Sequence, residues 1–144
     1  MKNFLLLLFM TLCISGLSAQ KSITPDARLI AAWGEETVTN YVNNNQNTLD
    51  YYNFYLDNAF FIEDFPQDKG AGYDDLPNLE LKAAFANETH DFSSADLKQF
   101  NVLKYDVKRS QTYRVTYRLG SSHKIITFYS GMELINEYNK LRNN

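Results

Sequence analysis

The hydrophobic pattern of this chain changes period along its length, and this change restricts the folds that the chain can adopt. Between Leu29 and Phe60, apolar residues recur every three or four positions. In Leu103–Lys108 and Thr112–Leu119 they instead alternate with polar residues. The first period is typical of amphipathic helices and the second of half-buried strands. The sequence therefore predicts helices first and an antiparallel sheet afterwards.

Two helices are expected in the first half of the chain. Thr24-Pro25-Asp26 is a typical helix start, since it offers a hydroxyl cap, then a proline, then an acid near the positive end of the helix dipole. Gly34 lies in the middle of this first helix, where it either admits a close backbone or breaks the helix. The amide-rich run at 43–47 ends it. The second helix is expected to begin after this run, with Asn47 or Thr48 as its cap.

Three strands are expected in the last third, at Leu103–Lys108, Thr112–Leu119 and Lys124–Tyr129, joined by short turns. The period of Phe60–Phe65 does not decide between helix and strand. These elements predict an α+β fold of two layers, with N-terminal helices, a three-stranded antiparallel meander and a C-terminal helix. Ser130 is expected to cap that last helix, whose apolar side is formed by Met132, Leu134, Ile135, Tyr138 and Leu141.

The N-terminus has the layout of a cleaved secretory signal. Lys2 is basic, Phe4–Leu12 is a short apolar run, and Ala19 ends the segment on a small residue. The apolar run is too short to cross a bilayer, which takes about 20 residues. The leader resembles those of envelope proteins from Bacteroidetes-type bacteria, which implies a compartment and no activity. We therefore expect a signal peptide at 1–19 and a single exported domain at 20–144, in the periplasm or outside the cell.

The expected mature chain contains no cysteine, because the only one, Cys13, lies in the leader. A disulfide, a zinc–thiolate site and a cysteine nucleophile are therefore excluded. Small secreted eukaryotic domains usually depend on disulfides, so this composition favours a bacterial envelope protein. Leu12 stands before Cys13, where lipoprotein signals resemble one another in having a small residue, and this argues against a lipid anchor. No transmembrane segment is expected after cleavage.

The charge of the chain argues against nucleic-acid partners. Residues 20–144 carry 13 basic and 17 acidic side chains, and their longest basic run is Lys108-Arg109. A nucleic-acid binder needs a basic face that replaces the counterions of the phosphates. We instead expect a protein or a glycan of the cell envelope as partner, and the sequence leaves the oligomeric state open.

Residues that could carry chemistry are few and their spacing is not specific. His90-Asp91 could form half of a general-base pair, but adjacent residues seldom face each other. Asp64, Asp68, Asp74 and Asp75 could supply oxygen ligands to calcium, yet their spacing fits no known calcium loop. The sequence therefore assigns no catalytic residue, no metal site and no cofactor.

Aromatic side chains are the most unusual feature of the composition, at 15% of the residues. Seven of them lie between Tyr51 and Phe65. Tyrosine is rigid, apolar on its faces and polar at its tip, which suits a groove for sugar rings or an apolar peptide. Helical spacing favours the core for most of them, whereas Phe54 is out of phase with the core stripe. The candidate binding residues are Tyr51, Phe54, Tyr55 and Tyr73.

These observations favour a non-enzymatic binding or interaction domain whose partner contacts the aromatic second helix. One alternative is a small envelope hydrolase or glycan-processing enzyme that uses carboxylates, with His90 as a further candidate. Another is a structural component of an envelope assembly without a ligand of its own, for which an exposed apolar patch is expected.

The calcium hypothesis gives a direct prediction. Because the acids of the 64–75 segment do not follow the spacing of a calcium loop, millimolar calcium is expected to leave the melting temperature unchanged. Thermal unfolding with calcium and with a chelator measures this, and a rise of several degrees would show that calcium binds.

Overall fold

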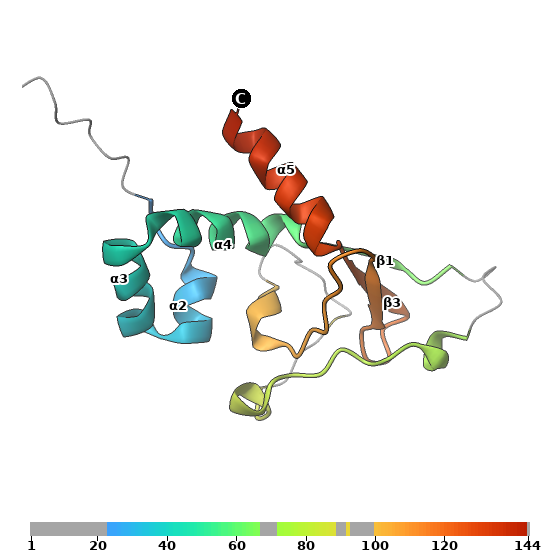
Figure 1. The fold of residues 1–144 in the computed structure, drawn as a ribbon. Helices are drawn as coiled ribbons and strands as arrows, with labels where there is room; N and C mark the ends of the chain where they lie inside the picture. The colour runs from blue at the N-terminus through green and yellow to red at the C-terminus, as the bar shows by residue number, and fades with distance from the viewer. Residues whose placement is uncertain (1–22, 67–71, 89–91, 93–99, 144) are drawn as a thin grey trace, which may run out of the picture.

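The computed structural model describes residues 23–66, 72–88, 92 and 100–143 (Figure 1). Three helices come first, and strand β1 follows the third; strands β2 and β3 and a final helix close the chain, which confirms the predicted α+β class. The leader at 1–19, with Cys13, and the pair His90-Asp91 lie outside the described residues. The main elements are α2 (Ala27–Trp33), α3 (Glu35–Asn44), α4 (Gln46–Asn58), β1 (Phe60–Asp64), β2 (Val115–Arg118), β3 (Lys124–Phe128) and α5 (Gly131–Asn143).

Gly34 breaks the expected first helix into α2 and α3. Its backbone has φ 84° and ψ 155°, a region that is open essentially to glycine alone. No atom lies within 4 Å of the place where a Cβ would stand, so the backbone angles and not a close approach require glycine. The predicted cap of α2 was wrong: the Asp26 side chain, not Thr24, accepts a hydrogen bond from the Arg28 N–H at 2.8 Å.

The boundary between α3 and α4 lies at Asn45. The Asn45 side chain accepts a hydrogen bond from the Thr48 N–H at 3.3 Å and so caps α4, which begins at Gln46. The prediction placed this start after Asn47, because several neighbouring amides can cap equally well and the sequence does not choose among them.

The sheet has the order β1-β3-β2, with antiparallel pairing on both sides of β3. Phe128 of β3 lies opposite Phe60 on one side and Val115 on the other. The segment that the sequence left open between helix and strand is therefore an edge strand. Three antiparallel strands are present as expected, but β1 takes the place of the predicted strand at Leu103–Lys108.

The prediction of a strand at Leu103–Lys108 was wrong. The segment starts as a 3-10 helix, η4 (Val102–Lys104), in which the Asn101 side chain accepts a hydrogen bond from the Leu103 N–H. Tyr105 then forms an isolated bridge with Leu81, outside the main sheet. Alternation of apolar and polar residues indicates which side chains are buried, but not whether the backbone pairs in a sheet. Tyr105 is buried, yet its only strand-like pairing among the described residues is the bridge to Leu81.

The core lies where the helices meet the inner face of the sheet. Phe128 and Ile126 of β3 are fully buried, as are Leu29 of α2 and Leu56 of α4. Burying such side chains stabilises the fold by about 1.5–3 kcal/mol each. The connecting segments complete the core with Leu79, Phe100, Val102 and Tyr105.

Ser130 caps α5 as predicted. Its hydroxyl accepts from the Glu133 N–H at 3.3 Å, while the Glu133 carboxylate accepts from the Ser130 N–H at 2.9 Å. This reciprocal pair is a capping box. The expected apolar side of α5 is only partly covered, because the helix extends away from the rest of the fold (Figure 1). Leu134 is buried and Tyr138 half-buried, but the remaining members are half exposed or more: Met132, Ile135 and Leu141.

Replacing Gly34 by alanine is expected to destabilise the protein. The substitution forces an L side chain into a backbone region that costs about 1–3 kcal/mol. A continuous helix would give the opposite sign, since alanine then gains about 1 kcal/mol over glycine. Urea unfolding measures the difference, with Thr39→Ala on the exposed face of α3 as a control that should not destabilise. Stabilisation by Gly34→Ala would contradict the helix break.

Candidate functional site

Helix α5 crosses α4 through an aromatic contact. The Tyr138 hydroxyl donates to the Asp50 carboxylate at 2.8 Å, and the Tyr138 ring lies 5.2 Å from Tyr51 and 5.3 Å from Phe54. These ring distances are typical of attractive aromatic pairs. Phe54 is out of phase with the core stripe of α4 because it packs under α5, a second helix that local periodicity does not reveal.

The four candidate binding residues do not form one site. Tyr51 and Phe54 are half-buried in the contact with α5, whereas Tyr55 is only 3% exposed. Burial raises the pKa of Tyr55 to about 12, and the Arg109 guanidinium lies 3.9 Å above its ring. Tyr55 therefore belongs to the core.

Tyr73 lies apart from the α4 tyrosines, at the turn between β2 and β3. It begins the 3-10 helix η1 (Tyr73–Asp75), and its hydroxyl donates to the carbonyl oxygens of Gly120 at 2.9 Å and Lys124 at 3.2 Å. These bonds fix the segment after β1 against the turn. The exposed His123, whose φ is 54°, lies beside the Tyr73 ring.

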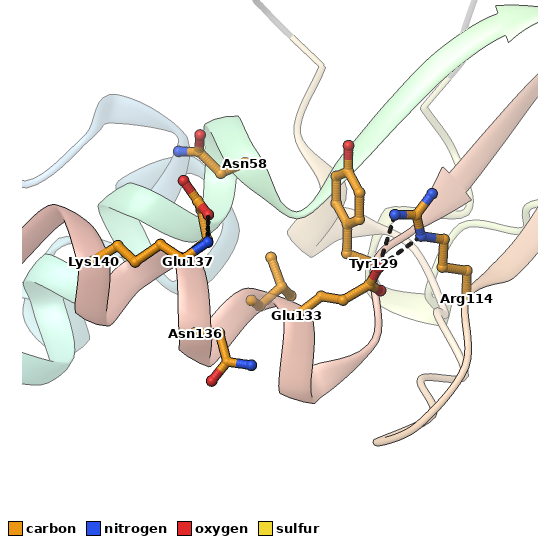
Figure 2. A pocket seen from close by; sticks show the side chains of 8 residues that line it. Asn58, Arg114, Tyr129, Glu133, Asn136, Glu137 and Lys140 are labelled. Atoms are coloured by element: carbon orange, nitrogen blue, oxygen red, sulfur yellow. Dashed lines mark hydrogen bonds and ion pairs between the residues drawn. The ribbon is translucent and has the colours of Figure 1, made fainter.

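One hollow of the described surface is a groove between the end of α4 and α5, with a volume of about 490 Å³ (Figure 2). The end of α4, the ends of β2 and β3 and one side of α5 meet here. Figure 2 shows Arg114 and Tyr129 on the strand side, facing the helix residues. We call this hollow the α4–α5 groove; it is lined by Asn58, Arg114, Tyr129, Glu133, Leu134, Asn136, Glu137 and Lys140.

Two ion pairs border the groove. Arg114 binds the Glu133 carboxylate through Nε at 3.0 Å and Nη2 at 2.7 Å, and its guanidinium lies 4.7 Å above the Tyr129 ring. Lys140 Nζ lies 3.3 Å from Glu137 on the same helix. The four formal charges cancel, so the groove has no net formal charge.

Glu133 is held as an anion. Its hydrogen bond from Arg114, and those from the backbone and hydroxyl of Ser130, lower the pKa of Glu133 to about 2. A carboxyl group in this state cannot donate a proton at neutral pH, so Glu133 does not fit the role of a general acid. The hydrogen bond with Glu133 also raises the pKa of Arg114. The Arg114–Glu133 pair therefore joins β2 to α5 and fixes one wall of the groove.

The remaining lining is suited to binding a neutral polar chain. Leu134 is buried beneath the groove, and amides from two helices stand at its sides. The Asn58 amide donates to the Phe54 carbonyl at 2.8 Å, which orients its oxygen. An apolar base with fixed polar groups around it is typical of binding sites for peptides and sugars.

Within the described residues, no cluster of three or more histidine, cysteine or acidic side chains is placed to hold a metal ion. Of the acids considered for calcium, Asp68 lies outside those residues. Among the described residues, no helix is long enough and apolar enough to cross a bilayer.

Comparisons with known proteins find no match to a protein family, to a curated protein or to a solved structure. The function therefore has to be argued from the groove itself.

Sequence reasoning missed most of the groove residues. Ser130 and Glu133 show the spacing of a capping box, which is a readable signal for the start of α5. The position of Arg114 and Asn58 beside that helix depends on contacts between distant segments. No local pattern reveals it.

The Arg114–Glu133 pair makes stability depend on pH. The folded pKa of Glu133, about 2, lies below the ordinary value of 4.5, so its stabilising effect is present above pH 4.5 and is lost as the pH falls through 2. Glu133→Gln is therefore expected to be less stable than the parent at pH 7, with a difference that disappears near pH 2. Urea unfolding across this range measures it.

The control is the same substitution made in the variant Arg114→Gln. There Glu133→Gln should lower the free energy of unfolding at pH 7 by less, because Arg114 is the largest cause of the lowered pKa of Glu133. A pH-independent difference between the parent and Glu133→Gln would contradict the ion pair.

Proposed function

We propose that this protein is an exported, non-enzymatic binding domain that contacts a protein of the cell envelope through the α4–α5 groove. One observation carries the proposal: an open groove of about 490 Å³ with an apolar base, an oriented amide at Asn58 and no net formal charge. Such a lining offers hydrogen bonds and apolar contact to a polypeptide.

Exposed apolar side chains on α5 support a protein partner. Met132 is 57% exposed and Ile135 50% exposed, and they precede the groove residue Asn136 by four positions and by one. Met132 lies one helical turn before Asn136 and so on the same side of α5, so a partner that reaches Asn136 from solvent also covers Met132. Burial of apolar surface is the main favourable term in protein association.

The groove does not support the alternative of a hydrolase that uses carboxylates. A general acid needs a raised pKa, whereas the pKa of Glu133 is lowered by its hydrogen bonds. A structural role in an envelope assembly uses the same exposed face of α5. The structural role and the binding role differ in stoichiometry. A structural component is recovered with a constant number of partner copies, whereas a binding domain is recovered with its partner in varying proportion.

Site-specific crosslinking in the native cells tests the proposal. A photoreactive phenylalanine analogue in place of Asn136 is expected to capture one dominant envelope protein, and the same analogue in place of the exposed Glu36 of α3 is not. Equal capture at both positions, or none at Asn136, would refute the groove as the binding site.

A pair of matched variants separates binding from folding. Met132→Asp on α5 is expected to abolish the crosslink from Asn136, because it places a charge in the apolar contact. Ile30→Asp on α2 changes an exposed apolar side chain of another helix, 40% exposed, and should leave the crosslink intact. Thermal unfolding of both variants shows that each is folded.

Export is a separate part of the proposal. The leader at 1–19 is expected to be removed, so that the mature protein begins at Gln20. Intact-mass measurement of the protein purified from the native envelope fraction checks this. An uncleaved chain recovered from the cytoplasm would contradict it.

A further inference from the structure

The backbone hydrogen bonds of β1 show which of its groups face away from the sheet. The Phe65 N–H donates to the His123 carbonyl at 2.8 Å, and the Tyr129 N–H donates to the Ala59 carbonyl at 3.0 Å. In an antiparallel ladder, every second residue bonds to the neighbouring strand and the residues between point outward. The outward N–H and C=O groups of β1 therefore belong to Phe60, Ile62 and Asp64.

The opposite edge of the sheet is covered by the chain itself. Arg118 of β2 donates its N–H to the Pro77 carbonyl at 2.9 Å and accepts from the Leu79 N–H at 3.0 Å. Along β1, by contrast, none of the described residues bonds to the outward backbone groups. An edge whose outward groups have no partner among the described residues is a template for a further strand.

Strand β1 is anchored to the core by its side chains. The Phe60 ring lies 5.2 Å from Phe100 and 5.8 Å from Phe128, and Ile62 packs against the core. A fixed edge binds an extended segment without first being ordered, which removes part of the entropic cost of association.

The free end of β1 is acidic. Glu63 and Asp64 are exposed, and the Asp64 side chain, 84% exposed, has Lys124 Nζ at 2.7 Å. Two carboxylates beside one ammonium leave a net negative charge at this end of the edge. The charge selects a segment that carries lysine or arginine.

We propose that β1 accepts an extended basic segment of the partner protein as a fourth strand of the sheet. This inference rests on the proposed function, because it states how the same partner binds. β1 begins two residues after Asn58, which lines the α4–α5 groove, so one end of this edge lies near the groove. Backbone hydrogen bonds then provide affinity, and the acids provide selectivity.

Hydrogen exchange of single amides, followed by NMR, tests strand addition. The probes are a synthetic basic peptide, acetyl-KVTVTVK-amide, and its acidic counterpart, acetyl-EVTVTVE-amide, at millimolar concentration. The basic peptide is expected to slow exchange at the outward amides of Phe60, Ile62 and Asp64 by about tenfold. The acidic peptide should have no effect. The amides of Phe61 and Glu63, which already face β3, are internal controls.

The variant Glu63→Lys is expected to abolish protection by the basic peptide, while Glu80→Lys, at another exposed acid, preserves it. No protection by the basic peptide, or equal protection by both peptides, overturns the proposal. Protection that appears in the protein alone as its concentration rises would assign the edge to a second copy and also overturns it.

The crosslinking experiment distinguishes the two proposals. If Asn136 captures a partner while the β1 amides remain unprotected, strand addition is wrong and the groove stands. If neither result is obtained, both proposals fail.

Discussion

The fold depends on the burial of β3 between two partner strands and the helical layer. Phe128 and Ile126 face the core from this central strand, and both are almost completely excluded from solvent. β3 pairs with β2 through a short turn and with β1 over a long separation, since Asp64 and its partner Lys124 are 60 positions apart in the sequence. Because β1 follows α4 after a single residue, its pairing with β3 also fixes α4 over the core. The remaining connections pack around this centre.

The candidate site is a consequence of how α5 leaves the sheet. The chain passes from β3 through Ser130 directly into α5, and Glu133 serves both the helix cap and Arg114 beside β2. One carboxylate therefore fixes the start and the direction of the helix. Tyr138 makes the second attachment through Asp50 on α4. The groove lies beside the first of these attachments, and the outer side of α5 stays exposed; the proposed binding function rests on these two features.

Local patterns predicted those elements whose environment follows from nearby residues. The capped start of α5 and the strand at Lys124–Phe128 are examples, since the capping box and the alternation of buried side chains are both local. The strand expected at Leu103–Lys108 failed because alternation reports burial and not the identity of the neighbour. Its backbone bonds to the segment around Leu81 instead. Phe54 was left unexplained for the same reason: its neighbour Tyr138 lies far away in the sequence.

The sequence by itself determined the α+β class, the order of helices before strands, the break available at Gly34 and the cap of α5. Each follows from periodicity or from the conformational preferences of single residues. Only the tertiary structure decided that Phe60–Asp64 is a strand, that Tyr73 lies apart from the tyrosines of α4, and that a groove forms beside α5. These features arise from contacts between segments that are distant in the chain. The free energy of such contacts depends on how the side chains of both segments pack together, which no local sequence pattern specifies.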